Sequence, residues 1–139
     1  MLIIPPQRGY DSHGSGAYLA RRGERLHNGV DFACWPGTEV LSMTSGIVTK
    51  IGVPYRYDPR NPLKSSFRYV QITSNGHDLR YFYLDPRVSK GDSVAEATVL
   101  GSVQDLPGVY PGITPHYHFE VRAHGEYLDT NEFIQSLIA

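Results

Sequence analysis

The sequence has almost no cysteine, and this excludes both an internal disulfide and a zinc site built from several cysteines. Its one cysteine, Cys34, is expected to be a small buried hydrophobic side chain. No excess of charge is present either, since 13 Lys and Arg balance 14 Asp and Glu, so nothing electrostatic points to a nucleic-acid partner. No apolar run approaches the length of a membrane span. We therefore expect neither a nucleic-acid nor a membrane partner.

An export signal is also missing, because residues 1–6 are too short for a signal-peptide core and lack its basic start. The chain is therefore expected to be made in the cytoplasm and then to be released by lysis or to belong to a larger particle. Its 139 residues predict a single domain over positions 1–139.

Turn-forming residues are abundant, with 14 glycines and 10 prolines, and they divide the chain into short β-type segments. The expected strands lie in segments 38–52, 67–74, 78–84, 93–104, 116–123 and 126–130. Asn75-Gly76 and His124-Gly125 are expected hairpin turns, and Ser45-Gly46 a turn or bulge. Only segment 130–138 has a helical apolar stripe, with Thr130 or Asn131 as its cap. We predict a mostly β domain with antiparallel sheet, long loops and a short C-terminal helix.

Two long irregular segments, 53–66 and 104–115, interrupt the expected strands. Loops of this length in a compact domain are more often functional than idle, so we expect them to line a cleft. Their tyrosines, taken one by one, are expected to be surface or packing residues.

His116 and His118 stand two residues apart in an expected strand, so their side chains share one face about 7 Å apart. Tyr117 and Phe119 then point to the other face, where Phe119 packs into the core. Imidazoles are costly to bury unless they bind something. Taken alone, the pair is as compatible with a structural role as with metal binding or catalysis.

His27 and Asp31 form a second candidate group in the stretch RLHNGVDFA. Gly29 and Val30 argue against a helix, and in a straight strand the two residues would lie about 13 Å apart. A turn or bulge at Asn28 and Gly29 would bring them together. In the alternative interpretation, Asp31 only caps a turn and His27 is exposed.

Together, two histidines and one aspartate are ligands of the kind that hold Zn²⁺ at about 2.0–2.2 Å. Three protein ligands leave a fourth position for water, which is typical of catalytic zinc sites. Three histidines (His27, His116 and His118) are available for two ligand places. The histidine of the strand pair that does not bind the metal would lie about 7 Å along the strand, beside the bound water.

The stretches HNGVDFACWPGTEV and TPHYHFEV, with the hairpin before YFYL and the segments VSKGDSV and VLG between them, resemble the lysostaphin and LytM type of zinc endopeptidases. The resemblance spans roughly residues 8–134. It implies cleavage of bacterial peptidoglycan peptides with Zn²⁺ as cofactor. It further implies that His27, Asp31 and His118 are the metal ligands and that His116 is a catalytic histidine beside the attacking water or the tetrahedral intermediate.

The sequence departs from this family where a Tyr-x-His-Leu pattern is expected, because Tyr83 stands in place of the second catalytic histidine. His77 lies six residues earlier, about 20 Å away along a strand, and is too far to replace it. In one interpretation the Tyr83 hydroxyl donates a hydrogen bond to the developing oxyanion and catalysis survives. In the other, the domain is a catalytically impaired, zinc-containing module that binds peptidoglycan or has a structural role.

We expect a monomeric zinc metalloendopeptidase acting on bacterial peptidoglycan peptide, in the setting of a bacteriophage lysin or a virion-associated lytic protein. His116 and Tyr83 are its expected catalytic residues. The alternatives are the impaired zinc module and a mostly β binding domain whose histidines hold no metal. Glu39 and Glu120 are expected to be structural.

Overall fold

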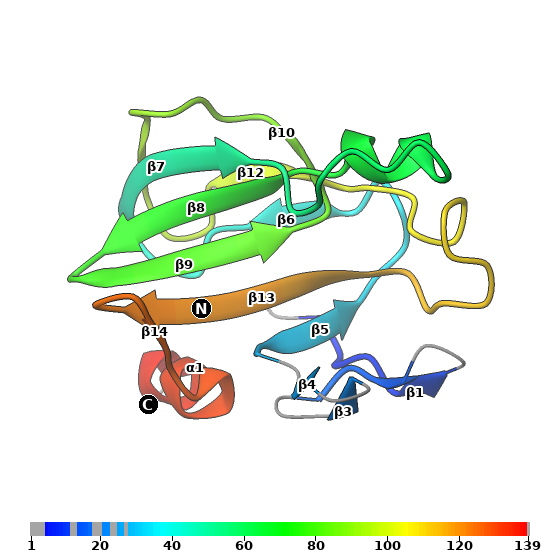
Figure 1. Cartoon of the computed structure of the whole chain (residues 1–139). Coiled ribbons are helices and arrows are strands. Elements are labelled where there is room, and N and C mark those ends of the chain that lie inside the picture. The colour runs from blue at the N-terminus through cyan, green and yellow to red at the C-terminus, as the bar shows by residue number, and fades with distance from the viewer. Residues whose placement is uncertain (1–4, 12–13, 18–20, 23–24, 27, 139) are drawn as a thin grey trace.

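The computed structural model describes residues 5–11, 14–17, 21–22, 25–26 and 28–138, and it confirms a mostly β fold with antiparallel strands and one short C-terminal helix (Figure 1). Within this described part, no helix is both long and apolar enough to cross a membrane.

The main sheet follows the order β11-β7-β8-β9-β13-β14, and β5 pairs with β13 beside β9. Its strands are β5 (Val30–Ala33), β7 (Gly46–Gly52), β8 (Tyr69–Ser74), β9 (His77–Phe82), β11 (Ser93–Val94), β13 (His116–Ala123) and β14 (Glu126–Tyr127). All its pairings are antiparallel. Strand β13 therefore lies between β9 on one side and β5 on the other (Figure 1).

A second sheet has the order β10-β12-β6 and lies behind β8 and β9 in Figure 1. Its strands are β10 (Leu84–Pro86), β12 (Val99–Val103) and β6 (Glu39–Leu41). Two small antiparallel pairs precede β5, namely β1 (Tyr10–Asp11) with β2 (Gly14–Ser15) and β3 (Arg21–Arg22) with β4 (Arg25–Leu26). The remaining elements are the 3₁₀ helix η1 (Pro62–Ser66) and the helix α1 (Thr130–Ile138).

The two expected hairpins are present. Asn75 and Gly76 join β8 to β9 with φ angles of 50° and 80°, and His124 and Gly125 join β13 to β14 with φ angles of 53° and 78°. Positive φ at both central residues matches the right-handed twist of the strands, which explains why Asn-Gly and His-Gly stand there. These turns fix the register of β8 with β9 and of β13 with β14.

The core lies between the two sheets, where apolar side chains from both are fully or almost fully buried. On β13, Tyr117, Phe119 and Val121 point into this core. Because side chains alternate along a strand, His116, His118 and Glu120 share the opposite face. The predicted division of this strand into a core face and a histidine face is confirmed.

The cap of α1 differs from the prediction. The Asp129 carboxylate accepts a hydrogen bond from the Glu132 amide at 3.0 Å, so Asp129 caps the helix instead of Thr130 or Asn131. The Thr130 hydroxyl is buried, and no described residue forms a hydrogen bond with it. The acceptor oxygen of the residue before the first helical turn reaches the free amides, which is what a cap requires.

The expected strand 78–84 breaks at Tyr83, which has a φ of 73°. The Tyr83 and Leu84 amides both donate to the Arg68 carbonyl, at 2.8 and 3.2 Å. The chain then leaves β9 and enters β10 in the second sheet. A left-handed conformation is uncommon and strained for a residue with a bulky side chain, and such positions cluster at functional sites.

Candidate active site

Asp31 and His118 meet because β5 and β13 pair in a register that places them directly opposite each other. The His118 Nδ1 atom lies 2.9 Å from the Asp31 Oδ1 atom, and the Asp31 side chain is buried. These are two of the three predicted metal ligands, and the structure brings them together. The third, His27, lies outside the described residues.

Gly29 lets β5 approach β13 this closely. It lies in a bend with Asn28 immediately before β5. A Cβ atom added to Gly29 would collide with the Phe119 carbonyl and would lie 2.8 Å from the Cε1 atom of the His118 ring. Any larger residue would therefore push the strand away from the imidazole.

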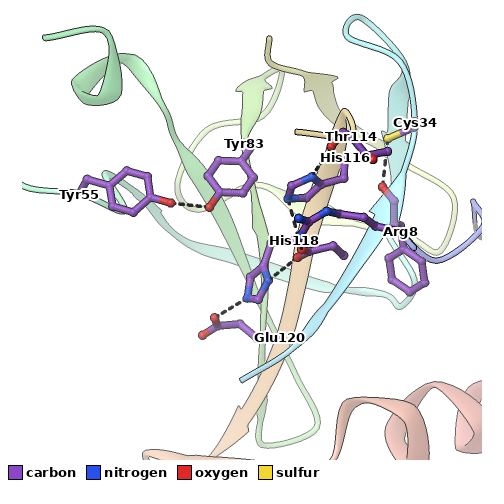
Figure 2. Close-up of polar contacts among 10 residues, drawn as sticks. Arg8, Cys34, Tyr55, Tyr83, Thr114, His116, His118 and Glu120 are labelled. Carbon is purple, nitrogen blue, oxygen red and sulfur yellow. Dashed lines mark hydrogen bonds and ion pairs between the residues drawn. The ribbon is translucent and has the colours of Figure 1, made fainter. Parts of the chain in front are cut away.

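Glu120 contacts the other nitrogen of His118. Its Oε1 atom lies 2.9 Å from His118 Nε2, and the carboxylate is almost fully buried (Figure 2). Burial lowers the pKa of His118, but the hydrogen bonds to Asp31 and Glu120 outweigh burial and raise it to about 9. A positive charge on this ring is thus stabilised from both sides.

Arg8 holds the second oxygen of Asp31. Its Nη1 atom donates to Asp31 Oδ2 at 2.7 Å, and only 3% of the arginine is exposed. The segment around it runs beside β5, because the Arg8 amide donates to the Asp31 carbonyl and the Ala33 amide donates to the Pro6 carbonyl. The pair is therefore a buried ion pair anchored by backbone pairing.

His116 lies on the same face of β13 as His118, two residues earlier in the strand. Its Nδ1–H donates to the Thr114 carbonyl at 2.8 Å, and its Nε2 atom lies 3.4 Å from Asp31 Oδ2 (Figure 2). Burial lowers the pKa of His116, against the opposing effect of the Asp31 carboxylate. The neutral ring with Nδ1 protonated leaves a lone pair on Nε2, which is the form that accepts a proton.

Tyr83 lies beside His116 with its ring almost perpendicular to the imidazole, at 88° and a centroid distance of 5.6 Å. Its hydroxyl is 2.5 Å from the Tyr55 hydroxyl (Figure 2). Burial raises the pKa of Tyr83 well above its ordinary value, so the phenol keeps its proton at neutral pH. The structure thus brings together the two predicted catalytic residues.

The two long loops meet around Tyr83. Tyr55 from segment 53–66 and Tyr110 from segment 104–115 both contact Phe67, and the Lys64 ammonium lies 4.8 Å from the Tyr55 ring centre and 5.9 Å from that of Tyr110. Segment 53–66 also lines an open hollow of about 570 Å³ formed by Tyr55, Arg56, Tyr57, Asp58, Pro59, Arg60 and Lys64.

Other residues singled out in the sequence, and some that were not, can also be compared with the structure. Tyr117 is a core residue, with 3% of it exposed, and Cys34 is half-buried against Phe32, where burial raises the pKa of its thiol to about 11. Arg8 carried no sequence signal, and Tyr55 was expected only as a residue of a long loop that lines a cleft. Glu120 was expected to be structural, although it follows His118 by two residues and so must share its face.

Among the described residues, no group of three or more histidine, cysteine or acidic side chains is arranged to hold a metal ion. The two predicted ligands within that part nevertheless fit zinc. Ligand atoms bonded to one tetrahedral zinc ion lie about 3.3 Å apart, close to the 2.9 Å between His118 Nδ1 and Asp31 Oδ1. A carboxylate on the outer nitrogen, as Glu120 provides, is the usual companion of a metal-binding histidine.

Comparison with known families gives the class of protein to which this fold belongs. The model of Peptidase family M23 matches residues 25–130. The chain therefore belongs to peptidase family M23. It is also 36% identical over 110 residues to the leukocyte cell-derived chemotaxin-2 of Bos taurus, covering 79% of this chain and 69% of that protein.

Solved structures share the fold. The catalytic domain of lysostaphin from Staphylococcus simulans is 23% identical, with a TM-score of 0.63 and coverage of 90% of this chain and 91% of that one. The prophage-encoded M23 protein EnpA from Enterococcus faecalis, as a mutant catalytic domain, is 21% identical, with a TM-score of 0.63 and coverage of 91% and 93%. Helicobacter pylori Csd3 is 23% identical with a TM-score of 0.65, and there the match covers 96% of this chain but spans only 33% of that one.

Proposed function

We propose that the protein is a zinc-dependent endopeptidase that hydrolyses peptide bonds in bacterial peptidoglycan. The observation that carries this proposal is the meeting of Asp31, His116 and His118 at the paired strands β5 and β13. Membership of peptidase family M23 supports the reaction class. The shared fold with lysostaphin, described as an antimicrobial peptidase, is in keeping with a bacterial cell-wall substrate.

His118 through Nδ1 and Asp31 through Oδ1 would hold the zinc ion, with His27 as the third ligand that the family pattern implies. A bound zinc ion supplies an acidified water and Lewis-acid polarisation of the scissile carbonyl. His116 accepts a proton from the attacking water at Nε2, because its Nδ1 proton is held by the Thr114 carbonyl. The protonated Tyr83 hydroxyl donates a hydrogen bond to the oxyanion as it develops.

The test is a digest of purified peptidoglycans of several chemotypes with the zinc-loaded protein, scored by released amines. Replacing His116 by alanine removes the general base, so we expect a loss of about a hundred- to ten-thousandfold in rate. His124→Asn is the matched control, because this histidine lies in the exposed β13–β14 turn at a positive φ that asparagine tolerates. No amine release from any chemotype by the wild type would rule out the peptidase.

A second candidate function is favoured by the bond between the Tyr83 and Tyr55 hydroxyls. Tyr83 stands where the family has its second catalytic histidine. If the bond to Tyr55 occupies the Tyr83 hydroxyl, this hydroxyl cannot donate to the oxyanion, and the domain is a zinc-containing module that binds peptidoglycan without cleaving it. The name of the Bos taurus relative, a chemotaxin, is in keeping with a role other than hydrolysis in this family.

The two candidates are separated by Tyr83→His together with a cell-wall pull-down. An enzyme that uses Tyr83 as a weak donor gains rate when histidine is restored. A binding module instead sediments with the wall, releases no amines and gains nothing from the substitution. Robust turnover by the wild type excludes the second candidate.

We propose further that the protein acts as a monomer and reaches the wall through lysis or as part of a virion. A prophage-encoded protein with the same fold is in keeping with this setting. Light scattering of the purified protein tests the monomer, and mass spectrometry of purified virions tests the virion. A stable dimer, or lytic activity secreted by intact cells, would contradict these proposals.

A further inference from the structure

Two buried charges of opposite sign flank the Asp31–His118 pair. Arg8 contacts the aspartate and Glu120 contacts the histidine, and 3% and 5% of these residues are exposed. Charged side chains are almost never buried to this degree unless they are paired. Each of the two therefore needs its partner, and each partner is a predicted metal ligand.

The two carboxylate oxygens of Asp31 have different partners. Its guanidinium donates to Oδ2 at 2.7 Å, whereas Oδ1 faces the His118 Nδ1 atom at 2.9 Å. A cation already bonded to Oδ2 opposes the approach of a second cation to that oxygen. Asp31 is thereby oriented to offer one oxygen to a metal and not both.

Glu120 likewise determines which nitrogen of the His118 ring is left for a metal. It engages Nε2 at 2.9 Å from the same strand, two residues further on. With Nε2 held by a carboxylate, Nδ1 is the nitrogen that faces Asp31. A carboxylate in this place also makes a histidine a more basic ligand.

We propose that Arg8 and Glu120 are positioning residues that make Asp31 Oδ1 and His118 Nδ1 the two atoms that face the metal. This inference rests on the zinc site of the proposed function. The matched family region begins at residue 25, so Arg8 lies in the N-terminal segment that precedes it. That segment is held on β5 by the backbone bonds of Arg8 and Pro6.

The test measures zinc affinity by competition with a chelator and records the visible spectrum of the Co²⁺-substituted full chain. Glu120→Leu and Arg8→Met should each weaken zinc binding by about ten- to a hundredfold. Arg8→Met should also reduce the intensity of the cobalt bands, because an unrestrained Asp31 carboxylate adds a fifth ligand atom. Glu120→Gln, which keeps an acceptor oxygen for His118, should recover most of the affinity.

Arg60→Met is the control, since 92% of the Arg60 side chain is exposed and it pairs only weakly, at 3.4 Å, with Asp58. It should leave the affinity and the cobalt spectrum unchanged. If Arg8→Met fails to fold, Arg8→Lys replaces it, because an ammonium keeps the charge but not the fork of the guanidinium, and a changed cobalt spectrum is still expected.

Folded Arg8 and Glu120 variants with wild-type affinity and wild-type cobalt bands would overturn the inference. So would a loss of stability without any change at the metal, which is what a purely structural role predicts. A parallel peptidoglycan digest separates this from the proposed function. A wild type that binds zinc as described but cleaves nothing refutes the peptidase and leaves the positioning role intact.

Discussion

The candidate site has two sides built on different physical principles. The ligand side consists of Arg8, Asp31, His118 and Glu120, which are buried except for part of His118 and are joined by charge-assisted bonds across β5 and β13. The tyrosine side consists of Tyr55 and Tyr83, which are neutral and held by a loop and a strained turn. His116 lies between them. In the proposed enzyme, metal binding and the completion of catalysis thus depend on separate parts of the chain.

The two sides also differ in how much free energy of unfolding a substitution should cost. Removing one member of a buried ion pair leaves an uncompensated charge, at a cost of about 3–5 kcal/mol. Removing one neutral hydroxyl bond costs about 0.5–1.5 kcal/mol. The ligand side therefore contributes to folding as well as to function, whereas the tyrosine side can change its chemistry with little effect on the fold.

Asp31→Ala should have the largest effect and should break the ligand side. In protein stripped of metal, we expect the free energy of unfolding to fall by about 3–5 kcal/mol, because the Arg8 guanidinium stays buried without its carboxylate partner. Urea unfolding monitored by circular dichroism measures this loss.

Asp58→Ala is the matched control, since its pair with the exposed Arg60 should be worth less than about 1 kcal/mol. If Asp31→Ala costs no more than Asp58→Ala, the ligand side does not contribute to folding, and the contrast between the two sides disappears.

Much of the ligand side was predictable because sheets convert sequence spacing into position. Alternation placed His116 and His118 on one face, and the Asn75-Gly76 hairpin fixed the register of β8 with β9, the strand that pairs with β13. What alternation alone did not provide was the pairing of β5 with β13, which places Asp31 opposite His118. That pairing joins segments 87 residues apart, and no local pattern encodes it.

Gly29→Ala should have an intermediate effect on the same side. The added methyl group collides with the Phe119 carbonyl and the His118 ring, so β5 must shift away from β13. Overpacking of this kind costs about 1–3 kcal/mol. We expect lower thermal stability together with weaker zinc binding, measured by calorimetric unfolding and chelator competition.

Gly9→Ala provides the comparison, because a Cβ atom there meets nothing within 4 Å and the residue is exposed. Equal stability and equal zinc affinity for the two alanine variants would mean that close approach at Gly29 does not shape the site.

The tyrosine side resisted prediction for physical reasons. Tyr83 was expected inside a continuous strand, but its positive φ ends β9, and no turn-forming residue in YFYL signals such a break. Tyr55 approaches from a long loop whose path depends on packing against Phe67 and Lys64. Arg8 was equally invisible, because an isolated arginine among glycines and prolines reads as exposed.

Tyr55→Phe should have the smallest effect and sharpens the comparison most. The ring and its contacts remain, and only the bond to the Tyr83 hydroxyl is lost, so stability should fall by about 1 kcal/mol. If Tyr55 orients Tyr83 towards the oxyanion, kcat of the zinc-loaded enzyme falls by about fivefold, the equivalent of that energy. Tyr57→Phe in the same loop, at a residue that is 68% exposed, should change neither quantity. A rise in kcat for Tyr55→Phe would instead show that Tyr55 withholds the hydroxyl from the reaction, as the non-catalytic alternative requires.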